Sequence, residues 1–296
     1  MIHSDWLGAF AVFAEDANLS RAAKRLHLSQ PAVHAQLRKL SGELGVPLYK
    51  RVGRGLALTR EGVLVAAYAR DSEERARELV ARLRGEGEGE QRVVLAAGAG
   101  ALLHVLGEGM RAFSRSYEGR LEIVTADGIA AAEAVASGTA HVGVTATLAG
   151  GPVLAELDVH RITEVGQLVV MPRDHRLAKR RRLALSDLEG ERLVLPPEGR
   201  PQRAMLDRLF ATARVRVAAG AIATGWELTL RLVELGSGLA IVNASVRVPR
   251  GLGARPIAEL PRVRYEAITR RRPRDAVASL VRALVAHGEA WKRSSS

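Results

Sequence analysis

Apolar residues in the first seventy positions recur with helical spacing, except in one short segment where they alternate. Over residues 7–70 this pattern predicts a first helix, a helix-turn-helix over about 19–44, two short strands over 47–58 and a long amphipathic helix after them. Gly53, Arg54 and Gly55 stand at the tip of the predicted hairpin. This order of elements predicts a winged helix-turn-helix over residues 1–58.

The small core of this motif can be assigned from the spacing. Ala23 stands where the two helices must cross, because a larger side chain there would push them apart. Asn18 or Ser20 is expected to cap the first of these helices and Ser29 the second. The residues expected to close the core are Leu26, Leu28, Val33, Leu37, Leu40 and Leu44.

Positive charge is concentrated on the same segment. Between Ser20 and Arg60 the chain carries nine Lys and Arg residues and one acid, Glu43. Phosphate neutralisation supplies most of the affinity of a DNA-binding protein, so this segment is expected to bind duplex DNA. A charged helix face is more often simply solvated, but here the charge coincides with a capped second helix and a wing. The expected DNA contacts are Ser20, Arg21, Gln30, Pro31, His34, Arg38, Lys39, Arg51 and Arg54.

The same residues resemble a known family. The runs at 20–33, 36–40, 43–46, 48–51 and 58–62 are similar to those of the LysR-type transcriptional regulators. The resemblance is specific over about the first seventy residues and extends to the rest through length and architecture. His34 and Ala35 depart from it, since Ser and a basic residue are common there. Both lie on the expected base-reading turn, so the recognised DNA sequence cannot be transferred from a relative.

A long helix and a glycine-rich segment follow the wing. Residues 59–84 read as one helix capped by Thr59, with a discontinuous apolar stripe at Val63, Leu64, Ala67, Leu79, Val80 and Leu83. Such a helix needs a partner, and pairing with a second copy is the simplest solution; packing on its own domain is the alternative. Alternating Gly and Glu at 85–90 cannot build a core, so this segment is expected to be a hinge.

After the hinge, strand-like and helical runs alternate, which predicts α/β architecture with parallel sheets over residues 91–296. Strands are expected at 92–97, 121–125, 141–144, 167–171, 192–195, 215–218, 239–242 and 264–269, and helices at 102–115, 129–136, 204–211, 227–235 and 274–290. The resemblance implies two lobes like those of periplasmic binding proteins. Lobe 1 would span about 91–162 and 270–296, and lobe 2 about 163–269.

Ligands of open α/β sheets bind at the carboxyl ends of strands, beside helix N-termini. The resemblance implies an effector in the cleft between the lobes. A helix N-terminus together with arginine favours an organic anion over a neutral sugar. For each residue, ordinary loop chemistry is the competing interpretation. The expected effector contacts are Gly98, Ala99, Gly100, Thr145, Ala146, Arg200, Arg203, Thr224 and Trp226.

The remaining composition narrows the function class. The chain has no cysteine, no catalytic motif, no histidine pair with metal-ligand spacing and no signal-peptide pattern or apolar run of membrane-spanning length. We therefore expect a cytoplasmic non-enzyme without metal or cofactor. Residues 91–296 hold thirty basic and twenty acidic residues, or +10 of the net charge of +12, and the clusters at 173–182 and 262–274 are expected to be solvated surface.

The function these features favour is a sequence-specific transcriptional regulator controlled by a small-molecule effector. Its expected partners are double-stranded DNA, the effector and a second copy of itself, as a homodimer or homotetramer, with RNA polymerase as a further candidate and no membrane. One alternative is a ligand-binding protein whose N-terminal domain mediates protein contacts. The other is an architectural DNA binder indifferent to ligand.

Overall fold

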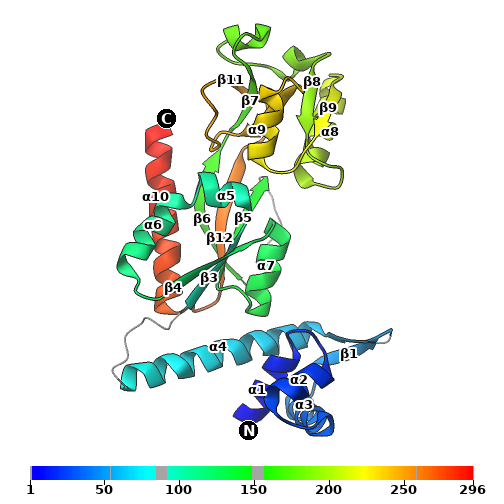
Figure 1. Cartoon of the computed structure of the whole chain (residues 1–296), viewed down its shortest axis with the longest axis vertical. Coiled ribbons are helices and arrows are strands. Elements are labelled where there is room, and N and C mark those ends of the chain that lie inside the picture. Colours follow the sequence, from blue (N-terminus) through cyan, green and yellow to red (C-terminus); the bar gives the residue numbers. More distant parts are fainter. Residues whose placement is uncertain (1, 54, 85–91, 149–156, 258, 296) are drawn as a thin grey trace.

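The computed structural model describes residues 2–53, 55–84, 92–148, 157–257 and 259–295. The chain forms an N-terminal helical domain, a long helix and two α/β lobes, stacked along the longest axis of the molecule (Figure 1). The predicted hinge at 85–90 and the wing residue Arg54 lie outside the described residues.

The N-terminal domain is a helix-turn-helix with a hairpin wing. Its helices are α1 (Ser4–Phe13), α2 (Leu19–Leu26) and α3 (Gln30–Leu44), and its wing pairs β1 (Tyr49–Val52) with β2 (Gly55–Leu58) in antiparallel register. The side chain of Asn18 accepts a hydrogen bond from the Arg21 amide, and that of Ser29 accepts one from Ala32, so the second helix has its predicted cap and Asn18 is the cap of the first.

The predicted core of this domain is confirmed except at one position. Ala23 is buried at the crossing of α2 and α3, and Val33, Leu37 and Leu40 are fully buried. Leu26 and Leu44 pack against the core and are partly buried. Leu28 is 41% exposed, so its assignment to the core was wrong. The backbone turns through a left-handed residue at His27 (φ 55°), which leaves Leu28 at the surface of the turn.

Helix α4 (Arg60–Leu83) begins at the predicted cap, because Thr59 Oγ1 accepts a hydrogen bond from the Gly62 amide at 3.0 Å. It packs on α1 at one end and on α7 (Gly128–Ser137) of lobe 1 further along. Part of the predicted stripe is exposed, including Leu64, Leu79, Val80 and Leu83. Ala67 is buried instead, because it lies against lobe 1 at Gly138.

Lobe 1 is a mixed sheet with strand order β4-β3-β5-β12-β6, covered by helices. β3 pairs in parallel with β4 and β5, and β12 pairs antiparallel with β5 and β6. Its elements are β3 (Arg92–Ala97), α5 (Ala99–His104), α6 (Gly107–Ser116), β4 (Arg120–Thr125), α7 (Gly128–Ser137), β5 (Val142–Leu148), β6 (Leu157–Val165), β12 (Val263–Arg270) and α10 (Asp275–Ser295).

Lobe 2 has strand order β11-β7-β10-β8-β9, in which β8 pairs in parallel with both of its neighbours. Its elements are β7 (Gln167–Pro172), the 3-10 turns Arg176–Lys179 and Leu185–Leu188, β8 (Arg192–Leu195), α8 (Pro201–Ala213), β9 (Ala218–Ile222), α9 (Trp226–Glu234), β10 (Leu239–Asn243) and β11 (Leu252–Ile257).

The strands that the sequence pattern missed lie at sheet edges. β6 and β11 were not predicted, and the strand expected at 215–218 begins only at Ala218. All three are edge strands, which need no continuous apolar run, and β11 even contains Pro256. The helix expected over 102–115 is interrupted at Val105 and Leu106, whose side chains turn into the lobe 1 core and divide it into α5 and α6.

Of the two crossings between lobes, the second differs from its expected position. The chain leaves lobe 1 at Gly166, between β6 and β7, close to the crossing expected near Thr163. It has returned by Val263 rather than near Thr269, because β12 belongs to the sheet of lobe 1. Val263, Tyr265 and Ala267 of β12 are buried in the lobe 1 core, and this burial determines the lobe to which the strand belongs.

Candidate nucleic-acid interface and ligand cleft

Helix α3 presents one side to the domain core and the other to solvent. Pro31 stands in its first turn, where a missing amide proton is tolerated. Helical spacing places the buried residues on one face, so the polar residues between them project outward. The exposed residues are Gln30, Pro31, His34, Ala35, Arg38 and Lys39.

The polar groups around this face are only lightly engaged. Ser20 Oγ lies 3.4 Å from Gln30 Oε1, so the starts of α2 and α3 are close to each other. Arg21 Nε is 3.0 Å from Asp16 Oδ2, in a pair open to solvent. Lys39 extends over the ring of Trp6, with Nζ 5.9 Å from the ring centroid, and therefore lies toward α1.

The wing adds an exposed cation beside α3. Arg51 is exposed on β1, opposite Leu56 of β2. The strand is anchored by Tyr49, whose ring packs edge-on against Phe13 with centroids 5.2 Å apart. Burial raises the pKa of Tyr49, in keeping with a structural position for this phenol.

A cavity of about 1570 Å³ occupies the cleft between the lobes and continues along lobe 1 to α4. Its volume exceeds that of a drug-sized site because it joins a cleft and a groove. All but one of the expected effector contacts line it: Gly98, Ala99, Gly100, Thr145, Ala146, Arg200, Thr224 and Trp226. Arg203 does not line it, because Asp207 (2.9 and 3.0 Å) and the Pro196 carbonyl (3.2 Å) hold its guanidinium elsewhere.

The two lobes contact each other directly across this cleft. Arg200 Nη1 of lobe 2 is 3.2 Å from Asp127 Oδ2 of lobe 1. A Cβ added to Gly100 would lie 2.7 Å from Cδ1 of Trp226, so the indole of α9 packs against the glycine itself. Beside it, His104 Nε2 lies 2.9 Å from Glu227 Oε1.

Asp127 is one of the cleft residues that the sequence pattern did not indicate. Its side chain caps α7 by accepting from the Ala130 amide at 3.1 Å, and this bond together with Arg200 holds the pKa of Asp127 below its ordinary value. The available signal was an aspartate between a strand and a helical run, which is a typical cap position. The predicted effector cation Arg200 is therefore already paired in this structure.

Buried polar side chains form the floor of the cleft near the first crossing. Gln167 is 2% exposed and donates from Nε2 to the Pro261 carbonyl at 2.8 Å. Asn243 donates to the Tyr265 hydroxyl at 2.7 Å, and burial raises the pKa of that phenol. Thr145, 8% exposed, lines the cavity nearby. These groups can orient a polar ligand, but none forms a nucleophile–base pair with a neighbour.

Two kinds of feature are absent from the part of the chain that the structure describes. Among the described residues, no helix is long and apolar enough to cross a membrane. Within the same residues, no group of three or more His, Asp or Glu side chains is placed to hold a metal ion.

Two family models cover nearly the whole chain. The model described as "Bacterial regulatory helix-turn-helix protein, lysR family" matches residues 4–63, and "LysR substrate binding domain" matches residues 86–289. The chain belongs to the LysR family of transcriptional regulators. The predicted family, the two-part fold class and the function as an effector-responsive DNA-binding regulator are confirmed.

The LysR-type relatives are named as regulators and not as enzymes, as the sequence predicted. The HTH-type transcriptional regulator TfdS of Cupriavidus pinatubonensis is 32% identical over 249 residues, covering 81% of this chain and 82% of the relative. The RuBisCO operon transcriptional regulator of Allochromatium vinosum is 29% identical over 244 residues, covering 80% and 78%.

Solved structures of full-length regulators share the fold. A full-length OxyR variant from Pseudomonas aeruginosa aligns with a TM-score of 0.71 at 18% identity, covering 98% of this chain and 95% of that one. CbnR complexed with its target DNA aligns with a TM-score of 0.56 at 24% identity, covering 97% and 100%.

Proposed function

We propose that this LysR-type regulator reads duplex DNA with the N-terminal half of α3 and responds to a small organic anion bound between its lobes. The observation that carries the DNA-reading role is the division of α3 into two faces. Val33, Leu37 and Leu40 are fully buried, whereas the opposite row of polar side chains is exposed and free to enter a major groove. Its place of action is the cytoplasm, where its DNA target lies.

Substitutions on the polar face of α3 and on the cationic wing distinguish residues that read bases from residues that contact phosphates. Gln30→Ala or His34→Ala should cost roughly 1–3 kcal/mol on the cognate operator and relax discrimination there. Arg51→Ala should instead weaken binding to all sequences and reduce the salt slope by about one unit. Gel-shift titrations over a range of salt concentrations measure both effects. If Gln30→Ala and His34→Ala both bind like wild type, α3 is not the reading helix.

A dimer would place two reading heads on one operator, and α4 carries the surface for it. Leu64, Tyr68, Leu79 and Leu83 are exposed on this helix, at 44%, 61%, 58% and 78%. Exposed apolar residues repeated along one helix mark a contact with another copy. Homodimers formed through α4, and tetramers built from them, are the proposed assemblies.

Arg200 supports the anionic class of effector. It lines the cavity with its side chain 48% exposed, and its partner Asp127 belongs to the other lobe. A ligand carboxylate can replace Asp127 at the guanidinium, and the contact between the lobes would then pass through the ligand. Closure or opening of the lobes would follow as a shift in population. α5 has six residues, so its N-terminus adds only a few backbone donors at Gly98–Gly100.

A matched pair of arginines tests this site. A panel of aromatic and aliphatic carboxylates, with the corresponding alcohols as neutral counterparts, is screened by thermal shift on the full chain. Arg200→Ala should abolish stabilisation by the carboxylates that bind, whereas Arg203→Ala, on the next turn of the same segment and outside the cavity, should leave it unchanged. Equal binding of alcohols, or an unaffected Arg200→Ala variant, would exclude an anion at Arg200.

A further inference from the structure

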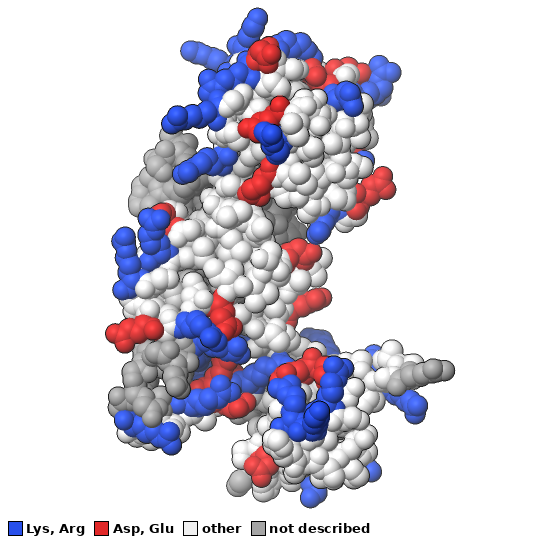
Figure 2. Space-filling model, viewed as in Figure 1, with Lys and Arg blue, Asp and Glu red and all other residues white. Residues whose placement is uncertain are grey.

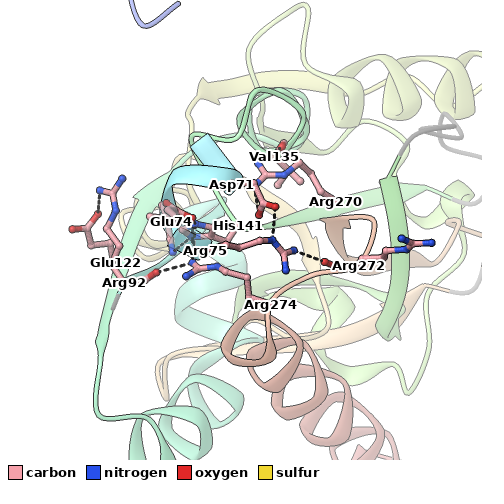
Figure 3. A network of polar contacts seen from close by, with 11 residues as sticks. Asp71, Glu74, Arg75, Arg92, Glu122, Val135, His141, Arg270, Arg272 and Arg274 are labelled. Atoms are coloured by element: carbon pink, nitrogen blue, oxygen red, sulfur yellow. Dashed lines mark hydrogen bonds and ion pairs between the residues drawn. The ribbon is translucent and has the colours of Figure 1, made fainter. Parts of the chain in front are cut away.

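A buried cluster of polar and charged groups joins α4 to lobe 1 (Figure 3). His141 and Arg274 line the part of the cavity that continues along lobe 1 to α4, and neither is one of the expected effector contacts. Glu74 of α4 meets His141 at the start of β5 and Arg274 at the start of α10. The side chains of Glu74, His141 and Arg274 are only 13%, 3% and 5% exposed. Arg274 was expected to be solvated surface as part of the cluster at 262–274, and that expectation was wrong because α4 covers it.

The hydrogen bonds of His141 determine which of its ring nitrogens donates and which accepts. His141 Nδ1 accepts from the Val94 amide at 2.8 Å, so the ring proton is on Nε2. Nε2 lies 2.9 Å from Glu74 Oε2 and donates to it. Lobe 1 therefore presents an oriented donor to a carboxylate on α4, and β3 holds that donor in place.

Arg274 supplies the compensating charge. Its Nη2 lies 3.4 Å from Glu74 Oε2 and 3.1 Å from the Arg92 carbonyl oxygen, to which it donates. Burial by itself would raise the pKa of Glu74, but the hydrogen bond from His141 and the charge of Arg274 hold it below its ordinary value. Removing the carboxylate would leave a buried guanidinium without its acid, which is much more costly than losing a surface pair.

Neighbouring contacts extend the cluster along one side of α4. Asp71 Oδ1 lies 3.5 Å from Arg270 Nη2, Arg75 donates to the Arg272 carbonyl at 3.0 Å, and Arg70 donates to the Ser137 carbonyl. Positions 67, 70, 71 and 74 share one helix face. The exposed apolar residues of α4 are therefore left available for a second copy while this face is occupied by lobe 1.

We propose that the Glu74–His141–Arg274 cluster is a docking joint that holds α4, and with it the N-terminal domain, on lobe 1 of the same chain. Arg270 ends β12, the strand by which the chain returns from lobe 2, and Arg274 immediately precedes α10. A ligand that moves lobe 2 against lobe 1 thus acts on a lobe to which the DNA-reading domain is directly fixed. The role of this joint in regulation rests on the proposed function. The contact between α4 and lobe 1 can be tested without ligand or DNA.

Cross-linking tests the joint directly, because the chain has no cysteine. A Cβ at Gly138 would lie 3.5 Å from Ala67 Cβ, within the range of a disulfide. It would also lie 2.7 Å from Arg270 Nη1, so that guanidinium must shift in every variant compared. The variant Ala67→Cys/Gly138→Cys of the full chain is oxidised with glutathione disulfide, and its products are separated on non-reducing gels. Gly138 has φ 77°, so cysteine there is strained, but equally so in every background compared.

Glu74→Gln and Glu73→Gln form the matched comparison in that background. Both remove one negative charge from α4, but the side chain of Glu73 is 58% exposed and pairs with Arg77. Glu74→Gln should slow formation of the intrachain disulfide by about tenfold or more, and Glu73→Gln should not change it. Should Glu74→Gln fail to unfold cooperatively, Glu74→Asp, which keeps the charge but shortens the reach, must slow the reaction instead.

The possible results are separable. Equal rates in the Glu74 and Glu73 variants overturn the joint, and so does a product that is a disulfide between two chains or no product at all. Operator gel shifts on the same proteins report the proposed function independently: absence of operator binding in wild type would refute that function while leaving the cross-linking result intact. With operator binding present, the oxidised protein should protect a footprint of the same length as the reduced one.

Discussion

The proposed DNA-reading face and the interlobe cleft are built in opposite ways. The exposed side chains of α3 come from one continuous helix, and their hydrogen bonds to protein are few and long, such as the 3.4 Å contact between Ser20 and Gln30. The cleft is assembled from segments tens to more than a hundred residues apart, and its side chains already bind one another, as in Arg200 with Asp127 and His104 with Glu227. A rigid helix suits a target of fixed shape, whereas lobes held by exchangeable contacts suit a switch.

The distribution of positive charge does not separate the N-terminal domain from the lobes. Figure 2 shows Lys and Arg on the N-terminal domain and again over the end of lobe 2 farthest from it. Several of the lobe 2 arginines pair with acids, including Arg176 with Glu191 at 2.6 Å and Arg180 with Asp187 at 2.7 Å. Positive charge by itself therefore does not identify a DNA-reading surface; the proposal for α3 rests on its division into a buried and an exposed face.

The largest expected effect comes from separating the two reading heads. Leu79→Asp should weaken dimerisation by roughly 2–4 kcal/mol, because a charge would have to be buried against the partner helix. That corresponds to a factor of about 30 to 1000 in Kd. Sedimentation velocity measures the shift, and Arg77→Asp, at a residue whose side chain is 66% exposed, is the control. An unchanged Leu79→Asp profile would move dimerisation to the lobes.

The dependence of the N-terminal domain on local packing is tested at Ala23. Ala23→Leu overfills the crossing of α2 and α3 and should destabilise the domain by roughly 1–3 kcal/mol. Ala35→Leu adds the same atoms on the exposed face of α3 and should leave thermal unfolding unchanged while altering operator binding. Calorimetry and gel shifts on both variants separate folding from reading. Equal melting temperatures would show that Ala23 is not a packing constraint.

A substitution at Gly100 tests whether the cleft depends on the contact between Gly100 of lobe 1 and Trp226 of lobe 2. Gly100→Ala places a Cβ 2.7 Å from the Trp226 ring, so the indole or the lobe must shift. We expect a loss of roughly 1–2 kcal/mol and no change in operator affinity without effector. Thermal unfolding measures the loss, and Gly107→Ala, where nothing lies within 4 Å of the added atom, is the control in the same lobe. A loss confined to Gly107→Ala would contradict the contact between lobes.

The smallest expected effect is a pH dependence of stability that arises from Glu74. This residue belongs to the contact between α4, which carries the N-terminal domain, and lobe 1. The pKa of Glu74 is lowered in the folded chain, so its contribution to docking is fully present above its ordinary value of 4.5. That contribution is lost as the pH falls through the lowered folded-state pKa. Unfolding curves from about pH 3 to 7 should therefore show wild type and Glu74→Gln converging at the acid end. A constant difference across that range would contradict this assignment of the carboxylate.

The sequence by itself determined the features that depend on near neighbours. Helical spacing and cap positions within a few turns account for the caps at Asn18, Ser29 and Thr59 and for the buried and exposed faces of α3. The family was identifiable from the same segment. All but one of the expected effector contacts also line the cavity, because ligand-binding loops follow strand ends in α/β sheets.

Only the tertiary structure decided which of those side chains are engaged and by what. Asp127 pairs with Arg200 across the cleft. Arg203 pairs with Asp207 outside the cavity, and the Trp226 ring packs against Gly100. The same holds for Arg274, whose burial depends on α4 packing over it, and for β12, whose lobe depends on pairing with β5 and β6. Most of these contacts join residues from tens to about two hundred positions apart, and spacing within one helix or strand carries no information about such distances.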